Sequence, residues 1–165
     1  MTLAEAAAQA DELAQAGDER ALADLRKAWD DEIEAAARDA DYRTRAVGYR
    51  AIAQFRFRQK LELLRRGLED DSPAARGSAL IALESVSRTH PGDVNAFRPL
   101  LHELAARDPN PTVRRLAVIC LKNGTPQPAT IQLLEGIGED DEADPELRKT
   151  ARAVCGALRK KAVAR

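Results

Sequence analysis

Apolar residues recur along the chain at the three- and four-residue spacing of amphipathic helices. The clearest stripe has apolar side chains at offsets of three, four, seven and eight positions: Val113, Leu116, Ala117, Cys120 and Leu121. Comparable stripes of mostly small or apolar residues begin at Thr44, Ala75 and Leu147. The pattern predicts four helices of the same construction. It contains no convincing β-strand.

Each of these four helices has a start signal. A residue whose side-chain oxygen can accept from an unpaired helix N–H stands before each stripe, namely Asp41, Ser72, Asn110 and Asp144. The last three of these residues are followed by Pro73, Pro111 and Pro145. Proline is tolerated at the first helical position because its missing N–H would be unpaired there anyway. The sequence therefore predicts four equivalent helix starts.

An internal repeat surrounds these starts. An acid lies two residues before each cap and an arginine four residues after it, and a second apolar helix precedes each acid. Helix pairs are expected at about 18–56, 57–89, 93–124 and 126–160, after a capping helix at 3–16 that begins with a Thr2–Glu5 capping box. The predicted fold is an all-α, α-α superhelix of about four helix pairs, a single domain over residues 1–165 with about nine helices.

Two positions blur the helix count. Residues 42–69 contain no proline, so one long helix is an alternative to the break that the repeat predicts near 55–58. Pro99 follows a plausible cap at Asp93, so that helix either kinks at the proline or starts near Arg98.

The repeated pattern resembles HEAT repeats, especially the short HEAT-like repeats of phycobilisome-lyase-type proteins. The segment 111–117, Pro-Thr-Val-Arg-Arg-Leu-Ala, is the best copy, and the segments at 73–79 and 145–151 follow it. The first repeat departs, with Tyr42 in place of the proline and Gly48 in place of the alanine. The likeness covers about residues 18–160.

The resemblance also implies a structural ladder, because in such repeats the turn acid and the helix arginine usually pair between neighbours. The implied members are Asp39, Asp70, Asp108 and Glu142 with Arg45, Arg76, Arg114 and Arg148. An exposed pair is worth only about 0–1 kcal/mol, but a ladder sets the register between repeats. Phosphate or partner binding by the four arginines is the less favoured alternative.

The formal net charge is −1, which argues against a dedicated nucleic-acid binder. The charge is unevenly divided, however, with −7 over residues 1–40 and +6 over residues 41–66. Residues 135–146 carry seven acids and no base, and residues 147–165 carry seven bases and no acid. We interpret the acidic run at 139–142 as a solvated loop, because it lacks the ligand spacing of a calcium loop.

The basic segment 43–66 is interleaved with aromatic residues, so nucleic-acid binding through it, of the HEAT-like DNA-binding type, is the alternative function. The favoured interpretation is that the aromatics belong to the core. Five of the six aromatic residues lie within residues 29–57.

No motif for catalysis, a metal or a cofactor is found, so the chain is predicted to be no enzyme and to need neither. His90 is expected in a turn, and Cys120 and Cys155 are expected as buried free thiols of a reducing compartment. The N-terminus lacks a signal peptide, and no stretch is apolar enough to span a bilayer. We therefore predict a soluble cytoplasmic protein with no membrane partner.

The predicted function is that of a non-catalytic interaction scaffold. The second helices of such pairs typically line the concave side, where basic side chains would attract a partner protein with an acidic surface. The candidate contact residues are Arg50, Ile81, Arg88, Arg115, Ile119, Lys122, Lys149 and Arg152. A lyase-like role on a tetrapyrrole-bearing protein is a third idea that rests on the resemblance alone.

Overall fold

The computed structural model describes residues 1–164, which form α-helices and one short 3₁₀ helix and contain no strand. The helices are α1 (Leu3–Ala16), α2 (Glu19–Ala37), α3 (Tyr42–Gln54), the 3₁₀ helix η1 (Arg58–Lys60), α4 (Leu61–Leu68), α5 (Pro73–Ser87), α6 (Gly92–Arg107), α7 (Pro111–Leu121), α8 (Pro128–Glu139) and α9 (Pro145–Val163). The all-α class predicted from the apolar periodicity is confirmed.

The chain divides into two compact units, unit 1 (1–86) and unit 2 (87–165), and each is described by itself. The single domain expected from the sequence stays a prediction. Helix α1 covers residues 3–16, and the division of the chain into a capping helix and four repeats likewise stays a prediction.

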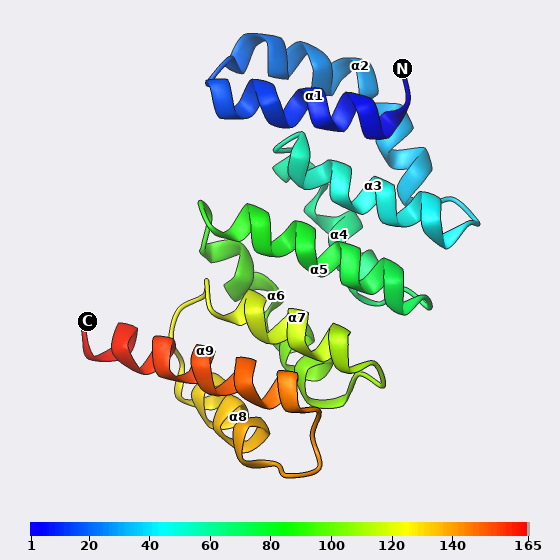
Figure 1. Ribbon diagram of the computed structural model, residues 1–165. Helices are drawn as coiled ribbons and strands as arrows, with labels where there is room; N and C mark the ends of the chain where they lie inside the picture. Colours follow the sequence, from blue (N-terminus) through cyan, green and yellow to red (C-terminus); the bar gives the residue numbers. More distant parts are fainter. Residues whose placement is uncertain (165) are drawn as a thin grey trace. The chain divides into compact units, whose positions relative to one another are not determined.

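Unit 1 is built around the contacts that α2 and α3 make with each other, with α1 and with α4. In Figure 1, α1, α3 and α5 form one layer of this unit, and α2 and α4 lie behind it. The core is aliphatic and aromatic, and its fully buried members include Leu22, Ile33, Tyr49, Ile52, Phe55 and Leu64. With Phe57, which is 8% exposed, this core holds three of the chain's six aromatic side chains.

Two glycines let the helices of unit 1 approach closely. A Cβ on Gly48 would lie 2.7 Å from the backbone nitrogen of Ala37, so α2 and α3 touch backbone to backbone at this point. A Cβ on Gly67 would lie 2.7 Å from the Cβ of Ala79. The glycine at position 48, where the best repeat copy has alanine, is thus a packing requirement of the first helix pair.

Unit 2 repeats the paired arrangement with α6 against α7 and α8 against α9. The pairs join through contacts of α7 with α9 and of α6 with α8. The buried side chains come from the predicted stripes, among them Phe97, Leu101, Val113, Leu121, Leu134, Leu147 and Leu158.

All four predicted helix caps are present. The side chain of Asp41 accepts from the backbone N–H of Arg43 at 2.9 Å, and that of Ser72 accepts from Ala75 at 3.3 Å. Asn110 accepts from Thr112 and Val113, and Asp144 accepts from Leu147 at 3.1 Å. At α1, the reciprocal bonds of the Thr2–Glu5 capping box are both made.

The predicted break in the long run 42–69 is also confirmed. Helix α3 ends at Gln54, and the chain turns at Arg56, whose φ of 53° lies in the left-handed region. The N–H of Arg56 donates to the carbonyl oxygen of Ala53, and that of Phe57 donates to the carbonyl oxygen of Ile52. These two bonds satisfy carbonyl groups that the end of the helix would otherwise leave unpaired. The alternative that this helix starts near Arg98 is wrong, because α6 starts at Gly92 and continues through Pro99.

Replacing Gly48 by alanine is expected to lower the free energy of unfolding by about 1–3 kcal/mol, since the added methyl group overlaps the α2 backbone. Gly136→Ala in α8 is the matched control, because a Cβ there meets nothing within 4 Å. That variant is expected to gain up to about 1 kcal/mol from helix propensity. Denaturant titrations measure both values. Equal effects of the two substitutions would contradict the close approach.

Candidate interaction surface

An ion pair buried within unit 1 fixes the turns at one end of its helices. Arg45 in α3 donates two hydrogen bonds of 2.8 Å to the carboxylate of Asp70, whose side chain is only 4% exposed. The same guanidinium also reaches the carbonyl oxygens of Asp39 and Ala40. The ladder expected from the resemblance is therefore confirmed at this rung, and its role is structural.

The surroundings of Asp70 control its titration. Burial alone would raise the pKa of this carboxyl group, but hydrogen bonds from Arg45, Ser72 and Tyr49 outweigh it and hold the pKa well below its usual range. Burial and the hydrogen bond to Asp70 raise the pKa of Tyr49 to about 12. Asp70 is therefore a fixed negative charge at neutral pH.

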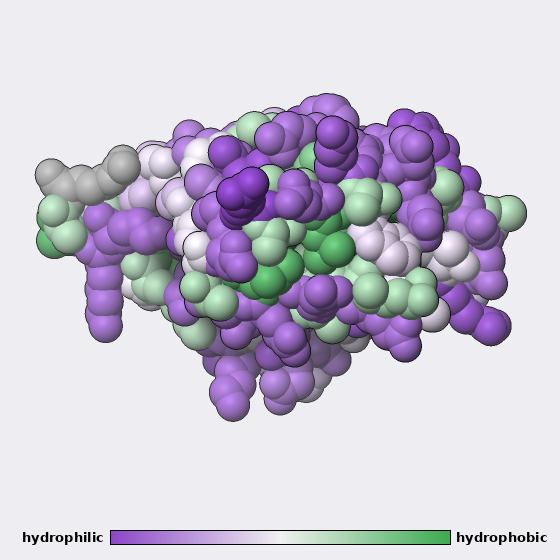
Figure 2. Space-filling model, turned by 90° about the horizontal axis from the view of Figure 1, so that it is seen from above, coloured by the Kyte–Doolittle hydropathy of each residue, from purple (hydrophilic) through white to green (hydrophobic). Residues whose placement is uncertain are grey.

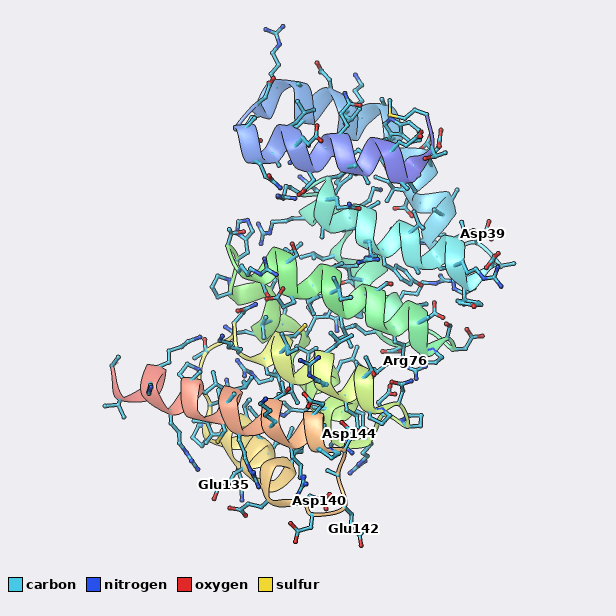
Figure 3. All side chains as sticks on the ribbon, viewed as in Figure 1. Asp39, Arg76, Glu135, Asp140, Glu142 and Asp144 are labelled. Carbon is cyan, nitrogen blue, oxygen red and sulfur yellow. The ribbon has the colours of Figure 1, made fainter. Side chains whose placement is uncertain are left out.

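The predicted ladder fails at its last rung. Arg114 donates through Nε to the carbonyl oxygen of Ala105, and residues 1–164 contain no ion pair between Arg114 and Glu142. The physical reason is the longer loop before α9, in which Asp140 takes the position of the turn acid and accepts from the backbone N–H of Glu142. The carboxylate of Glu142 is displaced outward as a result. Figure 3 shows Asp140 and Glu142 at the outer edge of unit 2.

Much of the basic segment 43–66 is neutralised inside unit 1. Arg56 pairs with Asp11 at 2.8 Å, and the buried ammonium of Lys60 lies between Asp30 and Glu34. These acids belong to the strongly acidic stretch 1–40. The opposite charges of the two stretches therefore serve to join α1 and α2 to the segment after α3.

The aromatic residues of this region are mostly unavailable at the surface. Tyr49, Phe55 and Phe57 are buried, and Trp29 is half-buried. Tyr42 is the exposed exception, and the guanidinium of Arg43 lies 5.4 Å from the centre of its ring. Base stacking would therefore have one open aromatic side chain instead of a row.

The hollow of unit 1 lies between α3 and α5 and is closed at one side by the start of α1. Its volume is about 390 Å³, and its lining consists of Ala4, Val47, Arg50, Ala53, Gln54, Ile81, Ala82 and Ser85. Two of the eight predicted contact residues, Arg50 and Ile81, thus meet in one depression. Val47 and Ile81 are 38% and 41% exposed, so both leave apolar surface open in this hollow.

The charge of this hollow comes from one side chain. Arg50 is its only charged lining residue, and it is exposed and makes no hydrogen bond or ion pair within the described chain. Helical spacing explains the arrangement, because Val47, Arg50 and Gln54 fall on one face of α3. Sequence reasoning missed Val47, which the apolar stripe assigned to the core.

A second hollow adjoins the first one. It shares Ala4 and Val47 with it and extends along α2 and the start of α3 past Ala36, Thr44 and Arg43. In the view from above, Figure 2 shows a mostly hydrophilic surface with a small hydrophobic area near its middle. The second hollow differs from the first in that Glu32, Asp39 and Arg43 are among its lining residues.

The predicted contact residues of unit 2 do not form one set. Lys122 and Lys149 are exposed, Ile119 is half-buried, and Arg115 donates to the hydroxyl of Thr150 at 2.9 Å. Arg152 is also exposed, and its Nε donates to the carbonyl oxygen of Gly138 in α8. Arg88 is exposed in the loop before α6 and has contacts of its own.

A polar cluster lies between α6 and α8, and within it Arg98 and Thr130 are buried. The guanidinium of Arg98 donates to the hydroxyl of Thr130 at 3.0 Å and to Asn95, and a ring nitrogen of His102 lies 2.8 Å from the same hydroxyl. Burial and the neighbouring charge of Arg98 lower the pKa of His102. Sequence reasoning gave no signal for this cluster, because Thr130 lies 32 residues from Arg98 and 28 from His102.

The remaining chemistry is sparse. Both cysteines are buried free thiols, as predicted. Residues 1–164 contain no cluster of three or more histidine, cysteine or acidic side chains able to hold a metal ion. Across the same stretch, no helix combines the length and the apolar character that crossing a bilayer requires.

The comparison with known families gives one match. Residues 31–103 match the family model for HEAT repeats, a range that runs from within α2 to within α6. This match, over less than half of the chain, confirms the predicted likeness to HEAT repeats for these residues. The finer likeness to the phycobilisome-lyase type is not confirmed by this match. No curated protein matches the chain.

Acid is expected to weaken the fold through Asp70. Because its folded pKa lies below the unfolded value of about 3.9, its contribution is full above that value and is lost as the pH falls toward the folded pKa. Asp70→Asn should therefore be less stable at pH 7 and show a shallower decline between pH 4 and 2. Asp71→Asn, at an exposed partner of the same arginine, should keep the wild-type decline. Denaturant titrations across this range give the slopes, and equal slopes for all three proteins would contradict the assignment.

A separate decline is expected near pH 6 from His102. The fold favours the neutral ring, so the unfolded chain binds more protons once the pH falls below about 6.5, and the free energy of unfolding decreases from there through the folded pKa. His102→Gln should flatten the curve between pH 7 and 5. His90→Gln, at an exposed position before α6, should leave it unchanged. Thermal unfolding at each pH measures the difference, and a decline that survives His102→Gln would refute this origin.

Proposed function

We propose that this protein is a non-catalytic scaffold that binds a partner protein with an acidic surface through the hollow between α3 and α5. One observation carries the proposal: two exposed β-branched side chains, Val47 and Ile81, stand beside the unpaired Arg50 in a depression of about 390 Å³. Apolar side chains in a hollow with a polar edge are typical of protein contact sites.

The kind of repeat supports the same function. HEAT repeats commonly serve as protein-interaction scaffolds. The lining of the hollow contains no acid, histidine or cysteine among the described residues, and its single hydroxyl, Ser85, has no base beside it there. A contact role therefore suits these residues better than a catalytic one. In unit 2 taken by itself, the exposed Lys122 and Lys149 remain candidates for contact with an acidic surface.

Nucleic-acid binding through residues 43–66 has weaker support. Arg45, Arg56 and Lys60 are engaged with acids of unit 1, and most aromatics nearby are buried. A gel-shift assay with duplex and single strands at low and moderate salt tests it, because phosphate contacts weaken steeply with salt. A salt-sensitive shift that is lost on Arg43→Glu would favour this alternative over the protein partner.

The scaffold role predicts capture of a partner at the hollow. A photo-crosslinkable residue placed at position 81 in cells that naturally make the protein should trap a protein partner, whereas the same residue at the exposed position 163 should not. Arg50→Glu should reduce the crosslinked yield roughly fivefold, because attraction to an acidic surface becomes repulsion.

The matched control for the charge reversal is Arg20→Glu in the first turn of α2, an exposed position where an acid is well tolerated. It should leave the yield unchanged. Equal yields at positions 81 and 163, or a yield insensitive to Arg50→Glu, would reject the hollow as the contact site.

A further inference from the structure

We infer that the segment of the partner that enters the hollow is an amphipathic α-helix, with an aliphatic residue seated between Val47 and Ile81 and a carboxylate three or four residues away on Arg50. This inference rests on the proposed function and specifies the form of the partner. It follows from the polarity, the charge and the spacing of the lining.

The polarity of the lining selects a helix over an extended strand. Five of the eight lining residues are alanine, valine or isoleucine, and only Arg50, Gln54 and Ser85 offer hydrogen-bonding groups. An extended peptide would bring unpaired backbone N–H and C=O groups against this apolar surface, which is costly unless each finds a partner. A helix pairs these groups internally. All secondary-structure elements of residues 1–164 are helices, so the described part of unit 1 has no β-strand edge to which an extended peptide could add.

The charge of the lining selects an acidic helix. Among residues 1–164, Arg50 is the one charged group in the lining of the hollow, has no acid beside it there, and makes no hydrogen bond or ion pair. A carboxylate on the partner would supply the missing counter-charge, and partial burial beside Val47 and Ile81 would strengthen the pair relative to one in open water.

The spacing fixes the register. Val47 and Arg50 lie three residues apart on α3, so their axial separation is about 4.5 Å. A helix that lies along α3 presents side chains at the same separation when they are three residues apart, and a similar one at four. A volume of about 390 Å³ accommodates inserted side chains, while the helix itself lies across the rim.

The test uses a designed helical peptide with the full-length protein. The peptide carries two leucines and two glutamates, and the glutamates lie three and four residues from the leucines. A covalent bridge between side chains on the opposite face of the peptide keeps it helical. Two further peptides replace the glutamates with lysine, or the bridge with a central proline that breaks the helix. Methyl NMR signals of Val47 and Ile81 report binding.

The bridged glutamate peptide should shift both methyl signals and bind roughly fivefold more tightly than the lysine peptide. With Arg50→Glu the preference should reverse in favour of lysine, while Arg20→Glu should keep the original order. The proline peptide should bind at least tenfold more weakly than the bridged one.

Equal binding of the bridged and proline peptides would overturn the helical form, and equal binding of the glutamate and lysine peptides would overturn the acidic one. Absence of methyl shifts with the bridged glutamate peptide would also overturn the inference. The proposed function is judged separately by crosslinking at position 81, so a trapped partner together with failed peptides would leave the scaffold role standing and remove only the helical partner.

Discussion

The position at which each second helix starts determines which of its side chains enter the core. A cap such as Asp41 or Ser72 sets the first helical residue, and every later side chain then takes its direction from the 3.6-residue period. A start displaced by one residue would rotate the helix by about 100°. The buried stripe would then turn outward, and Val47 and Ile81 would no longer face one hollow. The caps and the turn acids behind them therefore fix the surface as well as the core.

Charge has two separate tasks in unit 1. Arg45 pairs with the buried Asp70, and the buried Lys60 pairs with the more exposed Asp30 and Glu34, and these pairs hold the turns and helices together. Arg50 lies on the same stretch of chain but has no such partner within residues 1–164. Two basic residues of this stretch, Arg56 and Lys60, thus bind acids of the helices before it, whereas Arg50 is left to meet another molecule.

The last helix pair shows how a repeat tolerates a change of loop length. Asp144 still caps α9, so the helix begins where the repeat requires. The turn acid has moved to Asp140, and Arg148 reaches only the exposed Asp141, at 3.5 Å. The cap is kept because it governs the start of the helix. The ladder pair is lost because it depends on where the loop carries its carboxylate.

The sequence alone determined the helices, because capping, proline placement and apolar period are local properties. It identified Asp41, Ser72, Asn110 and Asp144 as caps, and Arg50 and Ile81 as surface residues of the second helices. Only the tertiary structure brought Arg50, Ile81 and Val47 into one hollow, turned Arg152 toward α8 and gathered Arg98, His102 and Thr130. Those arrangements depend on how closely neighbouring helices approach and on the length of the loops between them. Contacts between residues that are far apart in the chain produce no periodic pattern in the sequence.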